Sequence, residues 1–230
     1  MATFALVPGG GGDPWEWHRL VPELQRRGHT AIAVRLPSDD DSAGWPEYAA
    51  AVVSAVGGCS DLVVVAASMG AFTAPLVCER RSVDLLVLLN AMIPRHGESF
   101  GEWWSATGSR DARRRYHASL GLPAAAAEDD AVMYYHDFSQ HLLEEALSRP
   151  QPTQSSTPLG EPWPLQAWPD VPTRVLAGRH DRLFPLAFQR RLARERLGLE
   201  VDEIDGGHAL ALSHGDALAE RLDGYVRGLS

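Results

Sequence analysis

Ser68 is the residue of this sequence whose surroundings best suit a nucleophile. It stands in Ala66-Ala67-Ser68-Met69-Gly70, between the continuous apolar run 62–66 and a helical pattern over 69–78. A nucleophilic serine needs a sharp turn between strand and helix, and small residues two positions before and after it let the two segments approach. Ala66 and Gly70 meet that need. The same position would also suit a serine that only caps the following helix.

His208 is the favoured general base. It follows Asp205-Gly206-Gly207, directly after the stretch 199–204, and a glycine-rich turn there lets a histidine reach a serine across the edge of a sheet. A neutral imidazole at that point can take the serine proton. The alternative is a loop histidine without a partner. His29, which opens a strand, and His214, which begins the last helix, suit the role less well.

Asp181 is the favoured acid, and it follows the apolar stretch 173–177. A carboxylate there would hold the imidazole tautomer and stabilise the imidazolium. The alternative is an aspartate that caps the next helix. Asp205 is the rival acid, but only three residues from the histidine it would need a tight local turn. Asn90 ends an earlier strand, and its amide carries no charge with which to stabilise an imidazolium.

The run Gly9–Gly12 after Val7-Pro8 predicts a backbone anion site. A tetrahedral intermediate needs N–H donors aimed at its oxyanion, and glycines let the backbone come close. We assign these donors to the amides of Gly10 and Met69. The alternatives are a flexible turn or a dinucleotide loop. The G-x-G-x-x-G register fails, because Pro14 or Trp15 stands where the third glycine belongs.

Apolar runs and amphipathic segments alternate around these residues. The alternation predicts an α/β fold: a mostly parallel six-stranded sheet with helices on both faces. The expected strands are 3–7, 30–35, 62–66, 83–89, 173–177 and 199–204. The expected helices are 15–27, 45–56 and 69–78, and one after each of the last two strands, of which the final one is 216–229.

The alternation stops between about residues 91 and 168, where short helical patterns over 101–120, 124–135 and 140–148 precede the proline-rich segment 150–169. So long an interruption is rarely a bare loop. We therefore predict a helical cap, residues 92–167, inserted into a core of residues 1–91 and 168–230. The substrate pocket is expected to include Gly9 and Gly11 of the glycine run. It is also expected to include aromatic and polar side chains of this cap: Trp103, Trp104, Tyr135 and His136. Packing of the cap onto the core is the alternative role for each cap residue.

Composition excludes several functions. The formal net charge is −9 and no arginine run forms a basic stripe, so a nucleic-acid partner is not expected. The chain has no lysine, which excludes a Walker-type phosphate loop and a pyridoxal Schiff base. Cys59 and Cys78 lie outside metal-ligand spacings, and the histidines and acids show none of the H-E-x-x-H kind, so no metal is expected. No cofactor is expected either, because the chemistry of a serine, a histidine and an aspartate needs none. Without a signal-peptide pattern or a membrane-length apolar stretch, we expect a cytoplasmic protein without a membrane partner, and we leave a homodimer open.

The chain resembles the α/β-hydrolase superfamily over essentially its whole length. The resemblance rests on the first strand with its glycine loop, on the elbow serine, and on the order Ser68, Asp181, His208. The short sheet and single cap are similar to its small esterase and hydroxynitrile-lyase-like branch. The segment 90–99 and Trp103-Trp104 resemble actinobacterial hydrolases without an assigned substrate. Two positions depart from the usual pattern: Pro8-Gly9 replaces His-Gly before the oxyanion residue, and Ala66 replaces a glycine in the elbow.

The expected function is that of a serine hydrolase acting on a small carboxylic ester or thioester through an acyl-enzyme. One alternative is a cofactor-free lyase that uses the same serine–histidine pair, although such an enzyme often wants a lysine, which this chain lacks. Another is a non-hydrolytic small-molecule binder on the same fold. Epoxide hydrolases and dehalogenases of this type carry aspartate where Ser68 stands.

Overall fold

The computed structural model describes residues 1–229 and is built on one six-stranded sheet with the order β2-β1-β3-β4-β5-β6. All five strand pairings are parallel, so the sheet is entirely parallel where the sequence predicted a mostly parallel one. The strands are β1 (Thr3–Val7), β2 (Thr30–Ala33), β3 (Leu62–Ala67), β4 (Leu85–Leu89), β5 (Thr173–Gly178) and β6 (Val201–Ile204). Every residue of the central strands β3 and β4 is buried, which requires cover on both faces.

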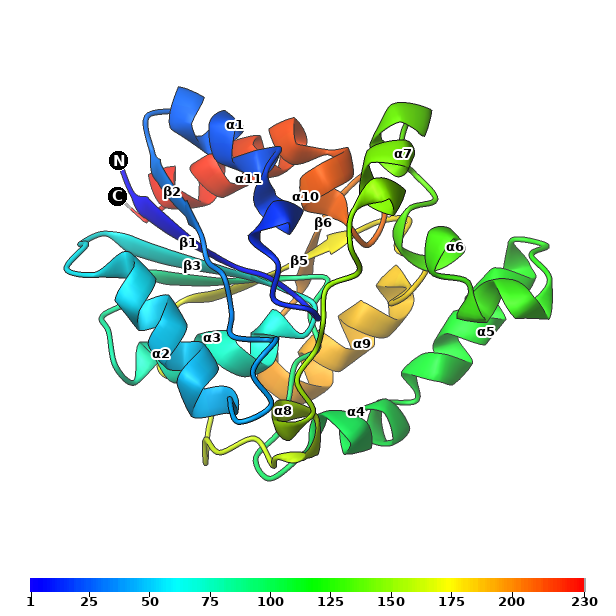
Figure 1. Cartoon of the computed structure of the whole chain (residues 1–230), viewed down its shortest axis with the longest axis horizontal. Coiled ribbons are helices and arrows are strands. Elements are labelled where there is room, and N and C mark those ends of the chain that lie inside the picture. Colours follow the sequence, from blue (N-terminus) through cyan, green and yellow to red (C-terminus); the bar gives the residue numbers. More distant parts are fainter. Residues whose placement is uncertain (230) are drawn as a thin grey trace.

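Helices supply that cover, as Figure 1 shows. The helices α1 (Leu20–Arg26) and α11 (Gly215–Arg227) pack on one face, while α2 (Trp45–Val56), α3 (Gly70–Cys78) and α9 (Leu186–Leu197) pack on the other. In α2 the buried side chains recur at the helical period, so one stripe faces the sheet. The expected helix 15–27 is divided into a 3-10 turn, η1 (Pro14–Trp17), and α1. No helix within residues 1–229 combines the length and apolar character that a membrane span requires.

The segment between β4 and β5 is mostly helical, and its helices α4 to α7 lie together at one side of the sheet domain (Figure 1). Its elements are α4 (Phe100–Thr107), α5 (Ser109–Ser119), η2 (Ala124–Glu128), α6 (Asp130–Tyr134), α7 (Gln140–Ser148) and α8 (Thr157–Gly160). The expected helix 101–120 is two helices, because Gly108 takes a left-handed conformation with φ +65° between them. The division into a core of residues 1–91 and 168–230 and a cap of residues 92–167 stays a prediction.

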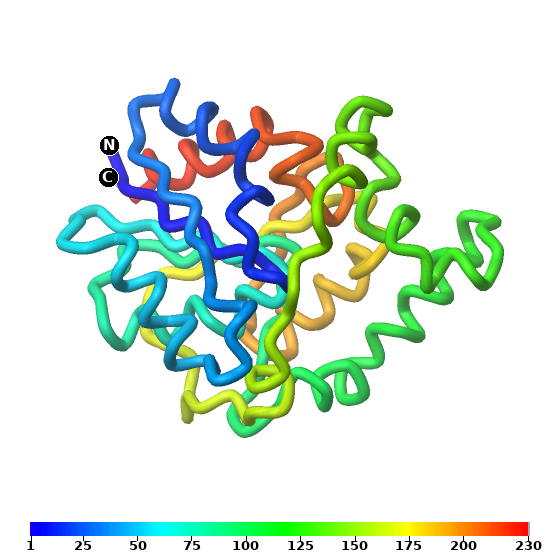
Figure 2. Tube along the Cα trace, viewed as in Figure 1, coloured from blue at the N-terminus to red at the C-terminus, as the bar shows by residue number. Residues whose placement is uncertain are grey.

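Residues 149–156, which we call the strap, carry no helix or strand up to the bend at Ser156. Two prolines without backbone N–H groups, Pro150 and Pro152, account for this. Figure 2 shows the strap running from the end of α7 past the loop that follows β1. Its fixed points are side chains: Arg149 Nη2 donates to Asp13 Oδ2 at 3.0 Å, and Ser155 Oγ lies 2.7 Å from the Tyr48 hydroxyl.

Candidate active site

Ser68 occupies a tight turn between β3 and α3, with φ +48°. Non-glycine residues rarely adopt this conformation, and the surrounding backbone has to hold it in place. The Ser68 N–H donates to the Leu89 carbonyl at 2.9 Å, and the Ser68 carbonyl accepts from the Met92 N–H at 2.9 Å. A Cβ at Gly70 would lie 2.7 Å from the Pro8 carbonyl oxygen, so only glycine fits where the turn meets the loop after β1.

Asp181 and His208 meet at the ends of β5 and β6. The His208 Nδ1 lies 2.8 Å from Asp181 Oδ2, and Asp181 is fully buried. The other oxygen, Asp181 Oδ1, accepts the backbone N–H groups of Leu183 and Phe184 at 2.8 and 2.9 Å. These bonds orient the carboxylate, so that Oδ2 faces the imidazole.

Asp205, the rival acid, lies elsewhere. Its side chain is 68% exposed and pairs with Arg179, while the His180 Nε2 is 3.8 Å away. It therefore belongs to a surface ion pair and not to the buried pair formed by Asp181 and His208.

Asn90, at the end of β4, also has a positive φ, +45°. Its side-chain nitrogen donates to the carbonyls of Gly207 at 3.2 Å and His208 at 2.7 Å. Its side-chain oxygen accepts the Gly178 N–H at 2.8 Å. One amide thus joins the loop that carries the histidine to the strand that precedes the aspartate, a role that sequence spacing does not reveal.

The glycine run after β1 lies beside the serine: a Cβ at Gly9 would be 3.2 Å from Ser68 Cβ, and one at Gly10 would be 4.0 Å from Met69 Sδ. The N–H groups of Gly9 and Gly11 are both hydrogen-bonded to side chains. Neither Gly10 nor Met69 donates its backbone N–H to an acceptor within residues 1–229. These two amides are therefore free to bind an incoming oxygen.

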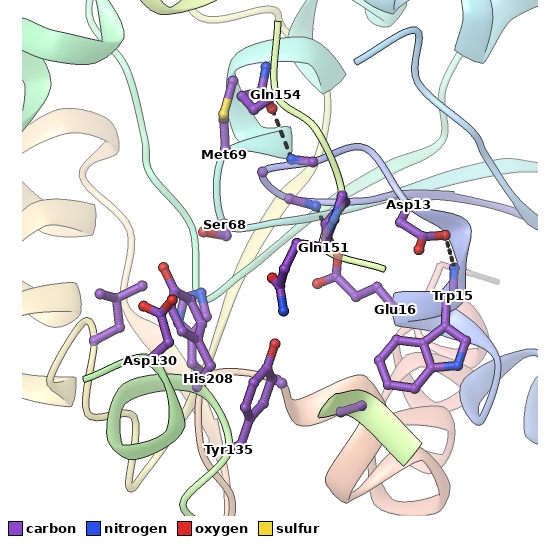
Figure 3. A pocket seen from close by; sticks show the side chains of 18 of the residues that line it. Asp13, Trp15, Glu16, Ser68, Met69, Asp130, Tyr135, Gln151, Gln154 and His208 are labelled. Atoms are coloured by element: carbon purple, nitrogen blue, oxygen red, sulfur yellow. Dashed lines mark hydrogen bonds between the residues drawn. The ribbon is translucent and has the colours of Figure 1, made fainter. Parts of the chain in front are cut away.

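A pocket of about 430 Å³ contains these groups, and both Ser68 and His208 line it. That volume suits a small organic ligand. The His208 ring lies edge-on to the rings of Tyr134 and Phe184, each 5.3 Å away between centroids. In Figure 3 no hydrogen bond joins Ser68 to His208. Such contacts are often long without a bound substrate.

Of the predicted pocket residues, Gly9, Gly11, Trp104 and Tyr135 line the cavity. The expectation for Trp103 is wrong, because its side chain is fully buried beside Phe184 and its Nε1 donates to the Ile93 carbonyl at 3.0 Å. In a helix, adjacent residues point in different directions, so only one of the tryptophan pair can face the pocket.

The expectation for His136 is also wrong. This residue does not line the cavity, and its Nε2 lies behind the histidine loop, 2.8 Å from where a Cβ of Gly207 would stand. The neighbouring Asp137 Oδ2 accepts the Gly207 N–H at 2.7 Å. That bond holds the segment of residues 136 and 137 against the loop that carries His208.

Several polar side chains on the pocket wall were not anticipated from the sequence. Figure 3 shows Glu16 and Asp13 on the side opposite His208, with Gln151 of the strap between Glu16 and Ser68, and Gln154 beside Met69. The Glu16 carboxylate accepts the Gly9 N–H at 2.8 Å. Burial raises the pKa of Glu16, against the opposing effects of that hydrogen bond and of His208. Glu16 follows the glycine run closely in the sequence, which could have marked it as a pocket residue, but the sequence does not show where its side chain points.

The described residues contain no candidate metal site. Within residues 1–229 no group of three or more histidine, cysteine, aspartate or glutamate side chains could hold a metal ion. The two cysteines, Cys59 and Cys78, are free thiols, and burial raises the pKa of the Cys78 thiol to about 12.

The sequence matches the family model described as "Alpha/beta hydrolase family" over residues 4–221. The chain therefore belongs to the alpha/beta hydrolase family, as its sheet order and strand–elbow–helix turn indicate. No curated protein sequence matches it.

Solved structures resemble the whole fold. Polyneuridine aldehyde esterase is 19% identical, with a TM-score of 0.76 over 98% of this chain and 99% of that one. A pyrethroid hydrolase from Sphingobium faniae JZ-2 is 17% identical, with a TM-score of 0.75 over 98% and 97%. An extracellular alpha/beta-hydrolase from a Paenibacillus species is 19% identical, with a TM-score of 0.74 over 96% and 98%. At these identities the likeness establishes the fold.

Proposed function

We propose that this protein is a serine hydrolase that cleaves a small carboxylic ester or thioester through an acyl-enzyme. The observation that carries the proposal is the meeting of three side chains, two on the wall of one pocket and the third in contact with the histidine. Ser68 stands at a turn held in a strained conformation, His208 lines the same cavity, and Asp181 lies 2.8 Å from the far side of the imidazole. An acyl transfer needs these parts: a nucleophile, a base and a group that orients the base.

The chemistry begins with attack of Ser68 Oγ on the substrate carbonyl carbon, while His208 Nε2 takes the hydroxyl proton. The carbonyl oxygen becomes an oxyanion, and the free N–H groups of Gly10 and Met69 are the donors for it. When the tetrahedral intermediate collapses, the bond to the alcohol or thiol breaks, and His208 gives that leaving group its proton. An acyl ester of Ser68 remains.

Water then attacks the acyl-enzyme, and His208 takes one of its protons. A second tetrahedral intermediate expels Ser68 Oγ, which recovers its proton from His208, and the carboxylic acid leaves. Asp181 fixes the tautomer with Nδ1–H donating to Oδ2, so that Nε2 is the basic nitrogen in both steps. No step needs a cofactor or a metal.

Pocket size and lining support a small substrate with an apolar part. The wall includes Met92, Phe100, Trp104 and Tyr134, and the cavity volume is about 430 Å³. Large aromatic surfaces bind acyl or alcohol groups by burying apolar area. Two of the similar structures are named as an esterase and as a pyrethroid hydrolase, which is compatible with a hydrolytic function for this chain.

The test is a panel of p-nitrophenyl esters and acyl thioesters of graded chain length and aromatic character, assayed with wild type and Ser68→Ala. We expect turnover of at least one neutral ester by wild type, and a fall in kcat of several orders of magnitude, roughly 10⁴-fold or more, in Ser68→Ala. Tight binding of a panel compound without turnover would instead support a non-hydrolytic binder. Turnover that survives in Ser68→Ala would contradict the assignment of the nucleophile.

A further inference from the structure

The four glycines after β1 differ in what their backbone N–H groups do. The Gly9 N–H donates to Glu16 Oε2 at 2.8 Å, and the Gly11 N–H donates to Gln154 Oε1 at 2.9 Å. The Gly12 N–H donates back to the Gly9 carbonyl at 3.2 Å. Within the described residues the Gly10 N–H has no acceptor, and Gly10 is the exposed member of the run. A free donor therefore lies between two donors that side chains hold.

Such a loop has little stiffness of its own. Glycine has the largest backbone freedom of any residue, so four in succession would not keep one N–H aimed at a fixed point. The His-Gly that commonly precedes the oxyanion residue is replaced by Pro8-Gly9. An oxyanion donor contributes most when it is already in place before charge develops. Contacts from other parts of the chain therefore have to hold the Gly9–Gly12 loop rigid.

Glu16 supplies one clamp, from η1. Its Oε2 fixes the peptide that joins Pro8 to Gly9, next to the serine. Its other oxygen, Oε1, accepts no hydrogen bond from residues 1–229, and the side chain stands on the pocket wall (Figure 3). Burial raises the pKa of this carboxyl. The hydrogen bond from the Gly9 N–H offsets part of the cost of burying it.

Gln154 supplies the second clamp, from the strap. Figure 3 shows its amide oxygen bonded to the loop. The side-chain nitrogen donates to the Tyr48 hydroxyl at 3.0 Å, which holds the amide in the correct orientation. The backbones are in close contact as well, because a Cβ at Gly11, where φ is +83°, would lie 2.7 Å from Pro152. Only glycine allows the strap to approach so closely.

We propose that Glu16 and Gln154 are positioning residues that hold the Pro8–Gly9 and Gly10–Gly11 peptides, which flank the Gly9–Gly10 peptide, so that the Gly10 N–H is aimed at the oxyanion. This inference rests on the proposed hydrolase function. It makes the strap part of the catalytic arrangement, because the oxyanion loop is rigid only while Gln154 is docked on Gly11. The clamps act on the transition state, so they should affect kcat more than KM.

The experiment compares substitutions that remove or keep the acceptor. Gln154→Ala and Glu16→Ala each remove one, whereas Gln154→Glu and Glu16→Gln keep an oxygen that can accept the glycine N–H. Thr153→Ala is the matched control in the strap, because Thr153 is exposed and its side chain has no hydrogen-bond partner among residues 1–229. The measurements are kcat and KM on the best neutral p-nitrophenyl ester, with Ser68→Ala as the inactive reference.

We expect each alanine variant to lower kcat by about tenfold or more, with KM within about threefold of wild type. The reason is that misaligning an oxyanion donor costs part of the rate that deleting the donor would cost. The acceptor-keeping variants should recover most of that loss, and Thr153→Ala should match wild type. If Gln154→Ala and Glu16→Ala behave like Thr153→Ala while wild type is active and Ser68→Ala is not, the clamp inference is wrong and the hydrolase proposal stands. If wild type cleaves no ester, the hydrolase proposal fails and the inference fails with it.

Discussion

The side chain of Asn90 donates a hydrogen bond of 2.7 Å to the backbone carbonyl of His208. The same side chain accepts the Gly178 N–H at 2.8 Å, just before the loop of Asp181. Asn90 therefore sits at the end of β4 as a bridge between two loops that approach each other only in the folded protein. Its positive φ of +45° is a conformation that asparagine tolerates better than most residues.

Asn90→Ala should lower the free energy of unfolding by about 2 kcal/mol, because it leaves buried backbone groups without partners. It should also reduce kcat, since the loop of His208 loses an anchor. Chemical denaturation and ester kinetics are the measurements. Asn90→Gly relieves the backbone conformation but lacks the same bonds, so it should show the same loss. Full recovery in Asn90→Gly would mean that backbone strain, and not the bridge, is what matters.

Asp181→Asn should reduce kcat strongly, by roughly 10⁴-fold, because an amide at this position favours the wrong imidazole tautomer. Asp205→Asn is the control, since its carboxylate lies on the surface with Arg179 and should contribute little to the rate. Steady-state kinetics of the two variants on one ester decides the assignment. A crippled Asp205→Asn beside a nearly normal Asp181→Asn would reverse it.

Trp103 and Trp104 offer a paired test of core against pocket. Trp103→Ala should destabilise the protein by about 3–5 kcal/mol, because a fully buried tryptophan leaves a large cavity. Trp104→Ala should have a smaller effect on stability and should change KM and chain-length preference, because its ring lines the cavity. Thermal unfolding and the ester panel separate the two effects. Equal loss of stability in both variants would contradict the placement of Trp104 on the pocket wall.

Much of the fold and of the candidate site can be predicted from the sequence, because the informative residues lie in strands or directly after them. Apolar runs mark the six strands, and the elbow serine, Asp181 and His208 each follow one of them. In a parallel sheet the carboxyl ends lie at one edge, so side chains placed there come together. That rule explains why Ser68 and His208 line one pocket although 139 residues separate them in the sequence.

The parts that could not be foreseen depend on contacts across long stretches of chain. Gln154 meets Gly11 across 143 positions, and Arg149 meets Asp13 across 136. Neither residue lies in a periodic segment that would fix where its side chain points. The adjacent Trp103 and Trp104 show the same limit at short range: both suit an aromatic pocket by type, and only the rotation of α4 decides which one lines it.

Glu16 should make stability depend on pH. Because burial raises its pKa above the ordinary value of 4.5, the folded protein binds this proton more tightly than the unfolded chain does. The contribution of Glu16 to stability is therefore greatest below the unfolded value, and it is lost as pH rises through the folded one. Glu16→Gln stays neutral throughout, so its melting temperature should gain relative to wild type as pH rises above 4.5. A difference in melting temperature that does not change with pH would contradict the raised pKa.

The central claim is that Ser68 is the nucleophile, and covalent labelling tests it most directly. Wild type and Ser68→Ala are treated with a fluorophosphonate probe, which reacts with activated serines, and the modified peptide is identified by mass spectrometry. The account predicts one adduct, on Ser68, in wild type and none in Ser68→Ala, together with loss of ester turnover in proportion to labelling. An adduct on another serine, or equal labelling of the variant, would contradict it.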